Sequence, residues 1–189
     1  MLKEIDEYGK CVGIVGFRSI CVTDVDKFFK GIDRIGIRGV EKQFFSADTI
    51  ATWEHIYFAV LDTLIAFRNK NNIANSTAVE TMLYASAQHQ IKVAIETVGI
   101  KTGTVNIAVL TLGDSAKAVT ETIRGISRLL KAEPDDTTLD LTLQKRKTIM
   151  KVFKISESEL KTVEIGCVDE KEALVNLVVE RMALFAARR

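Results

Sequence analysis

Proline is nearly absent from this chain of 189 residues, in which Pro134 is the only one. The sequence also has no serine- or glycine-rich tract and no internal repeat, so linkers and low-complexity segments are not expected. The length suffices for one well-buried core and is short for two ordinary domains. We therefore expect a single domain over residues 1–189.

Long apolar runs are absent too, and nothing approaches the about eighteen residues that a membrane helix needs. The N-terminal MLKEIDEYGK is charged and lacks the apolar region and cleavage site of a signal peptide. Cys11, Cys21 and Cys167 show no C-x-x-C spacing, which predicts free thiols in a reducing compartment. These features together predict a cytoplasmic protein that does not contact a membrane.

Positive and negative side chains are nearly balanced, and the net charge is +1. Such a chain has no overall field for nucleic acid, so any RNA contact would be a local patch. Two positively charged clusters are typical of solvated faces rather than of an RNA track. They are Arg124, Arg128 and Lys131, and then Lys145, Arg146, Lys147, Lys151 and Lys154.

Enzyme signatures are missing. The two histidines, His55 and His89, are far apart, and no H-x-x-x-H, H-E-x-x-H or paired-cysteine spacing predicts a zinc site. There is no G-x-S-x-G turn, and Gly13-x-x-Gly16 lacks the other residues of a P-loop or dinucleotide fingerprint. We expect no catalytic residue, no metal and no cofactor, with a free-standing enzyme as the less favoured alternative.

Apolar periodicity predicts an α/β fold. Strands are expected at residues 11–17, 40–47, 104–113 and 137–143. Helices are expected at residues 23–32, 53–65, 77–86, 86–98, 115–131, 144–155 and 169–189. The alternation favours one mixed β-sheet of at least four strands covered by helices.

The stretch NIANSTAVETMLYASAQHQI, residues 72–91, contains two helix starts in succession. Asn75, Ser76 or Thr77 can cap the first helix and Ser86 the second. The bend between them leaves free backbone N–H groups, which favour anions. Long polar side chains gather at this entrance, with a lysine one turn further on: Gln88, His89, Gln90 and Lys92.

Two segments, SADTIATWEHIYFAV and IANSTAVETMLYASAQHQIKVAIETVGIKTGTVNIAV, resemble the KEOPS (EKC) complex subunit family of Cgi type, which includes the PRPK-binding protein. The archaeal members are the most similar. The resemblance covers essentially the whole chain and is densest over residues 46–109. The family usually has S-G-x-R-Q-I, whereas this chain has Ala87 and His89 in place of the glycine and arginine.

The resemblance implies a non-catalytic subunit of the complex that attaches a threonylcarbamoyl group to the adenosine beside the anticodon of ANN-decoding tRNAs. It implies direct binding to the atypical kinase/ATPase of that complex and indirect contact with its threonylcarbamoyltransferase subunit. Archaeal relatives also help to recruit tRNA through its single-stranded 3′ CCA end. The alternative is a purely structural protein-interaction module that does not bind RNA.

For RNA, the expected contacts are Gln88, His89, Gln90 and Lys92, and the resemblance adds His55. Glutamine offers donors and acceptors, and histidine offers a planar ring for splayed bases. Gln88 and Gln90 are two positions apart and do not share a helix face. A plain polar helix start without a ligand remains the other interpretation.

For the kinase, the expected surface is the apolar face of the last helix. Leu174, Val178, Met182 and Phe185 form one stripe, which Val175 and Val179 flank. This stripe is wider than the about 100° that a surface helix needs. The helix is therefore either buried on two sides of its own domain or in contact with a partner, and the resemblance favours the partner.

Overall fold

Four antiparallel strands form the sheet in the order β1-β2-β4-β3. The computed structural model describes residues 1–165 and 169–187. The strands are β1 (Leu2–Ile5), β2 (Lys10–Phe17), β3 (Val40–Ser46) and β4 (Ile107–Gly113). The helices are α1 (Val25–Ile32), α2 (Trp53–Asn69), α3 (Thr77–Ser86), α4 (Ile91–Val98), α5 (Ala116–Leu130), α6 (Leu143–Phe153), α7 (Glu157–Glu164) and α8 (Glu170–Ala187). Three short 3₁₀ turns, η1 (Asp6–Tyr8), η2 (Ala47–Thr49) and η3 (Asp136–Leu139), complete the described elements.

Side-chain alternation along the strands divides the core into two clusters, one on each face of the sheet. Val12 and Ile14 of β2 and Leu110 of β4 belong to the larger cluster. Phe17 and Val109 belong to the smaller one. Because Ile14 pairs directly with Leu110, side chains of neighbouring strands meet on the same face.

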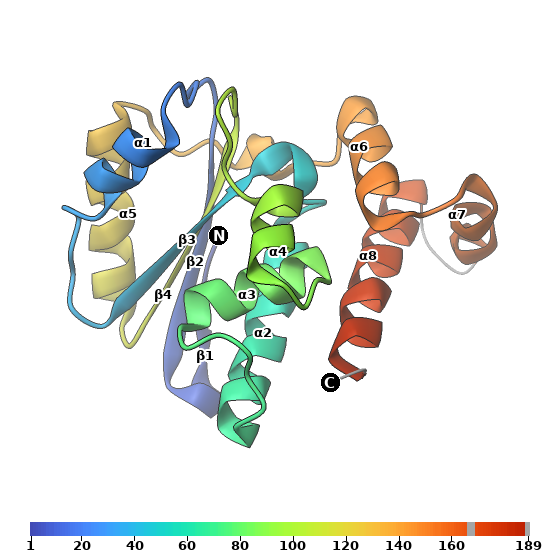
Figure 1. Ribbon diagram of the computed structural model, residues 1–189, viewed down its shortest axis with the longest axis horizontal. Coiled ribbons are helices and arrows are strands. Elements are labelled where there is room, and N and C mark those ends of the chain that lie inside the picture. The colour runs from blue at the N-terminus through green and yellow to red at the C-terminus, as the bar shows by residue number, and fades with distance from the viewer. Residues whose placement is uncertain (166–168, 188–189) are drawn as a thin grey trace.

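The helices lie in layers on both sides of the sheet, as Figure 1 shows. Helices α1 and α5 cover one face, while α2, α3 and α4 cover the other. Helices α6, α7 and α8 form an outer layer, in which α8 packs against α2 and α3. The larger core cluster therefore continues from the sheet through α2 and α3 into α6 and α8.

Two glycines of β2 lie where other segments approach the sheet closely. A Cβ at Gly13 would be 2.7 Å from the Val119 side chain of α5, and one at Gly16 would be 2.6 Å from the Asp135 carbonyl oxygen. The Gly16 carbonyl also accepts the Asp135 N–H at 2.8 Å. Close packing, rather than phosphate binding, accounts for this glycine pair.

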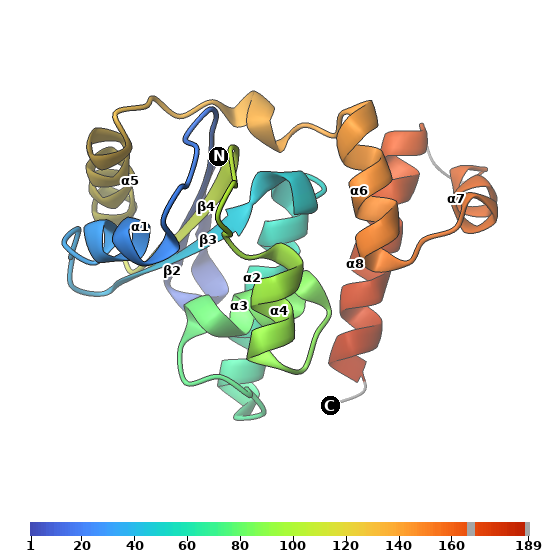
Figure 2. The ribbon, with the colours of Figure 1, turned by 45° about the horizontal axis from the view of Figure 1, so that its top comes forward.

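The strand expected at residues 137–143 is wrong. Residues Asp136–Leu139 form η3 and α6 begins at Leu143. Asp135 caps the turn, because its Oδ1 accepts the Thr137 N–H at 3.1 Å. Figure 2 shows the segment crossing from α5 to α6, where it joins none of the four strands. Leu139 is buried, whereas Leu143 of the same alternating pattern is 82% exposed, so the alternation does not mark one face of a strand.

The α/β class and a sheet of at least four strands covered by helices are confirmed. All three strand pairings are antiparallel, however, so the sheet is not mixed as expected. Strand β1 and helix α7 were not expected at all. Helix α7 carries a sequence signal that could have revealed it, since Ser156 and Glu159 form a capping box.

The described residues contain two free cysteines, of which Cys11 is buried and Cys21 exposed. Cys167 lies outside the described residues. Within residues 1–165 and 169–187, no helix combines the length and apolar character needed to span a membrane. In the same ranges, no three histidine, cysteine or carboxylate side chains gather as a metal ion would require.

Candidate nucleic-acid and partner surfaces

The loop before α3 is held by a buried carboxylate. Glu80 has no exposed surface, and its Oε2 accepts the N–H groups of Ile73 at 3.1 Å and Ala74 at 2.7 Å. Of the three expected caps, Ser76 is the one that caps α3, because its hydroxyl accepts the Val79 N–H at 3.2 Å. The IANS segment is thus a rigid entrance to α3.

The turn from α3 to α4 is built differently from the expectation. Ser86 does not cap α4, because it ends α3 and its hydroxyl donates to the Leu83 carbonyl at 3.1 Å. Ala87 follows with a φ of +52°, and the Gln88 N–H returns to the Leu83 carbonyl at 3.1 Å. This is a left-handed C-cap, a position that glycine normally occupies. Helix α4 then begins after Gln90, whose side chain makes no capping hydrogen bond.

The turn lines a groove of about 460 Å³ between α3, α6 and α8, which we call the basic groove. Its lining residues come from the turn and from the ends of two C-terminal helices: Ser86, Ala87, Gln88, His89, Val152, Phe153, Lys154, Arg181, Leu184 and Phe185. Gln88 and His89 are therefore brought together with basic and aromatic residues. Gln90 and Lys92 are exposed beside the groove and do not line it.

The basic groove has no carboxylate among its lining residues. Arg181 is 2.5 Å from Glu159 of α7 and is partly neutralised, whereas Lys154 is exposed. The exposed His89 ring lies against Phe185, with a centroid distance of 4.5 Å and a tilt of 41°. A positive charge, an aromatic ring and a glutamine amide thus line one groove, and such groups are the ones that proteins use to bind single-stranded RNA.

The structure contradicts the expected contact of His55 with RNA. The ring is fully buried, its Nδ1 accepts the Ala51 N–H at 3.1 Å and its Nε2 lies 2.7 Å from the Ala85 carbonyl. Since Nδ1 is an acceptor, the proton is on Nε2. Burial lowers the pKa of His55 from 6.5 to about 4, against the hydrogen bond to Ala85. His55 is a neutral structural residue.

The expected partner stripe of α8 is also corrected. Leu174, Val178, Met182 and Phe185 are at most 4% exposed, because this stripe faces the core formed with α2 and α3. A charged residue at Met182 would therefore disrupt the core rather than an interface. Val175 and Val179 are half-buried at its margins.

A second groove, of about 370 Å³, lies between the first halves of α2 and α8 and has the opposite charge. Its lining residues are Thr52, Trp53, Glu54, Phe58, Leu139, Asp140, Asp169, Lys171, Glu172, Val175 and Asn176. We call it the acidic groove, since four carboxylates surround one lysine there. Phe58 is 40% exposed at its edge, so an apolar anchor is combined with negative charge. Of the stripe expected on α8, only Val175 reaches this surface.

The sequence profile of the family described as kinase binding protein CGI-121 matches residues 29–185 of this chain. The regulatory protein Cgi121 of Methanocaldococcus jannaschii is 34% identical over 117 residues, which are 62% of this chain and 72% of the relative. The chain belongs to the CGI-121 family. The matched region contains both grooves.

Within this CGI-121 fold, several groove residues were not singled out from the sequence, among them Phe58 and Arg181. An exposed aromatic on an amphipathic helix is a usable signal for Phe58. The basic segment 145–154 was expected to be a solvated face, but Lys145 is only 5% exposed and Arg146 pairs with Glu157 and Glu170. Only its last lysine, Lys154, lines the basic groove.

Replacing Ala87 with glycine should stabilise the protein. A non-glycine residue in the left-handed region costs about 1–2 kcal/mol, part of which is offset by the greater freedom of glycine in the unfolded chain. We expect the free energy of unfolding of Ala87→Gly to rise by about 1 kcal/mol in urea denaturation. Ala183→Gly, at an exposed position inside α8, should lower it by about 0.5–1 kcal/mol. Equal effects at the two positions would contradict the turn geometry.

The buried His55 should make stability depend on pH. Its folded-state pKa is lowered, so its contribution is complete above pH 6.5 and is lost as the pH falls toward 4. Between pH 7 and pH 5 the free energy of unfolding should fall by about 2 kcal/mol. His55→Asn should be less stable at pH 7 and nearly independent of pH in this window. His89→Asn is the matched control and should retain the full pH dependence.

Proposed function

We propose that the chain is a non-catalytic regulatory subunit that binds the atypical kinase/ATPase of a KEOPS complex and helps to recruit tRNA through its 3′ CCA end. The observation that carries the kinase part is the match to a kinase-binding family over residues 29–185. The archaeal relative is named a regulatory protein, which supports a role without catalysis. The resemblance of residues 46–109 to KEOPS subunits supports the complex, in which contact with the threonylcarbamoyltransferase subunit would be indirect.

The acidic groove is the surface that we assign to the kinase. A protein interface is anchored by a few aromatic or apolar side chains at its centre, surrounded by charges that set specificity. Trp53 and Phe58 supply such anchors, with Val175 facing them from α8. Its negative charge would also repel RNA phosphates, so tRNA and kinase would use different grooves.

The basic groove is the surface that we assign to the RNA 3′ end. A splayed base can stack on His89, which is supported from behind by Phe185. Gln88 can bond a base edge, and Lys154 can contact a phosphate. Gln90 and the exposed Lys92 continue this surface along α4.

Replacing Phe58 with aspartate should weaken kinase binding by about 2 kcal/mol or more, because it removes an anchor and adds like charge. Calorimetry or co-purification with the kinase subunit measures this. Ile65→Asp is the matched control: Ile65 lies on the same helix and is 41% exposed against 40% for Phe58, but it does not line the groove. If Ile65→Asp lost binding and Phe58→Asp did not, the kinase surface would lie elsewhere on α2.

Charge changes in the basic groove should alter tRNA binding. Lys154→Glu should weaken binding to all tRNAs. It should also flatten the salt dependence: the slope of log K against log salt concentration should become less negative by about 0.7 for each lost phosphate contact with a single strand. His89→Ala should cost about 1–3 kcal/mol if a base stacks on the ring, and His89→Arg should tighten binding by adding charge. Lys92→Glu should weaken binding less than Lys154→Glu. Mobility shift with intact tRNA measures all four variants.

Two controls decide where the RNA lies. Arg124→Glu changes an exposed charge on α5, on the other side of the sheet, and should leave affinity unchanged. Removal of the CCA end from wild-type tRNA should reduce affinity as much as Lys154→Glu and His89→Ala together. If tRNA without CCA bound equally well, the groove would not receive the 3′ end. If no tRNA bound at all, the protein-interaction module would be the correct function.

A further inference from the structure

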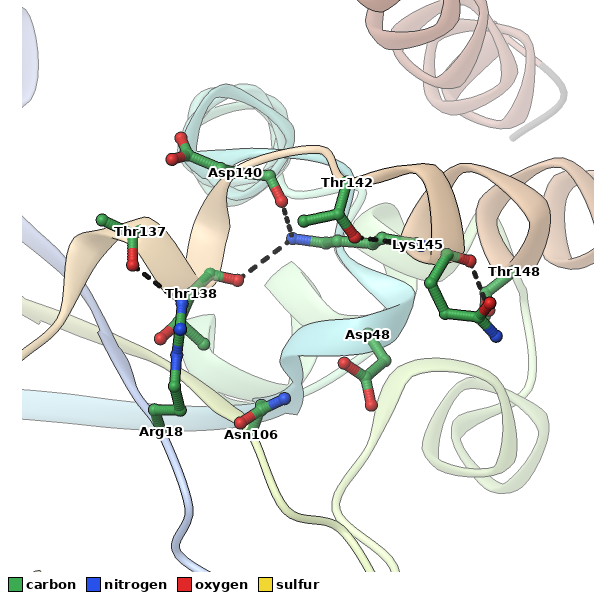
Figure 3. Close-up of a pocket in the computed structure, with 10 residues that line it drawn as sticks. Arg18, Asp48, Asn106, Thr137, Thr138, Asp140, Thr142, Lys145 and Thr148 are labelled. Carbon is green, nitrogen blue, oxygen red and sulfur yellow. Dashed lines mark hydrogen bonds between the residues drawn. The ribbon is translucent and has the colours of Figure 1, made fainter.

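A third cavity, of about 470 Å³, lies at the N-terminal end of α6 and is lined by polar and charged residues. Figure 3 shows it between η3, the start of α6 and η2. Its lining residues are Arg18, Asp48, Asn106, Thr137, Thr138, Asp140, Thr142, Gln144, Lys145 and Thr148. Its volume is within the range of about 300–1,000 Å³ that is usual for small-molecule sites. Neither groove assigned above includes Asp48 or Lys145.

Lys145 is a buried cation whose hydrogen bonding is incomplete. It is 5% exposed, and among the described residues its Nζ donates only to the backbone carbonyls of Thr138 and Asp140, each at 3.3 Å. An ammonium group has three donors, so one remains for another acceptor. No carboxylate of the described residues lies within ion-pair distance of it. Burial lowers the pKa of Lys145 to about 8, because it removes the charged form from water.

Another feature of the same wall is suited to an anionic group. Thr142 caps α6 and Gln144 lies in its first turn, where the helix dipole and free N–H groups favour negative charge. A carboxylate or phosphate oxygen at this wall would accept the remaining donor of the Lys145 ammonium group.

The opposite wall carries a negative charge. Asp48 is exposed and, among the described residues, has no hydrogen bond and no ion pair. Figure 3 shows Asp48 and Asn106 on the far side of the cavity from the Lys145 ammonium, and the Asp140 carboxylate directed away from it. Arg18 is already paired with Asp135 and donates to Thr137. One unpaired cation and one unpaired anion therefore face each other across the cavity.

We propose that this cavity binds a small zwitterion of the α-amino-acid class, with its carboxylate on Lys145 and the first turn of α6 and its ammonium group on Asp48. Such a ligand is neutral overall and presents opposite charges on adjacent carbons, which matches the two walls. A dianion such as phosphate would satisfy Lys145 but would be repelled by Asp48. This site goes beyond the proposed function and does not depend on it.

The test is calorimetric titration and thermal shift of the full chain, without kinase or tRNA, against the proteinogenic L-amino acids and inorganic phosphate. At least one amino acid should bind and raise the melting temperature. Removing either the amino or the carboxyl group from that ligand should weaken binding at least about tenfold. No binding by any amino acid, or tighter binding by phosphate, would overturn the proposal.

Two variants tie the binding to the named charges. Asp48→Asn should weaken binding of the amino acid about tenfold but should not weaken binding of the analogue without an amino group, because the two changes remove the same contact. Lys145→Met should abolish binding, whereas Lys147→Met, at an exposed position of the same helix, should not. If Lys145→Met fails to fold, the proposal is still tested by comparing how Asp48→Asn binds the amino acid and the analogue without an amino group. Equal weakening of both ligands by Asp48→Asn would sink the proposal.

Discussion

A single buried imidazole connects the parts of this protein that form its surfaces. The His55 ring joins the entrance of α2, through the Ala51 N–H, to the end of α3, through the Ala85 carbonyl. Its edge also packs against Phe153 at the end of α6, at 5.3 Å. Ala85 stands two residues before the left-handed turn, and Phe153 one residue before Lys154. Both walls of the basic groove therefore depend on one neutral side chain.

The same constraint links the basic groove to the acidic one. Ala51 is followed by Thr52 and Trp53, which line the acidic groove, so His55 fixes the start of α2 as well. Helix α8 contributes to both grooves, with Val175 near its beginning and Phe185 near its end. The acidic groove and the basic groove therefore lie near opposite ends of α8, and the buried stripe of this helix holds it against the core. Two partners of opposite charge could bind at once without competing for the same residues.

Much of the fold could be predicted from the sequence because periodicity reports which faces are apolar. The strand at 11–17 and the helix beginning at Trp53 follow directly from it. Periodicity does not report what covers an apolar face. For this reason the stripe of Met182 and Phe185 was assigned to a partner, although α2 and α3 cover it. The crossing segment 137–143 was mistaken for a strand for a related reason, because its apolar residues alternate although Leu139 is buried and Leu143 is exposed.

The candidate site was predictable where the residues are local and not where they come from distant elements. Gln88 and His89 were found from one polar stretch, whereas Lys154 and Arg181 join them only through the packing of α6 and α8. His55 was misplaced because sequence cannot distinguish a ligand histidine from a buried one that joins two helices. Its role depends on hydrogen bonds to the Ala51 N–H and the Ala85 carbonyl. These are backbone groups, so the residue types at positions 51 and 85 do not reveal them.

Ala87 and His89 depart from the glycine and arginine that the family resemblance leads one to expect, and their effects on stability oppose each other. Alanine at φ +52° strains the turn by about 1–2 kcal/mol. The His89 ring packs on Phe185, which in turn packs edge-on against Tyr84 at 5.2 Å. Such aromatic pairs contribute about 0.5–1.5 kcal/mol each, which is comparable with the strain. The histidine thus ties the turn to α8, at the loss of the permanent charge that an arginine would offer to RNA phosphates.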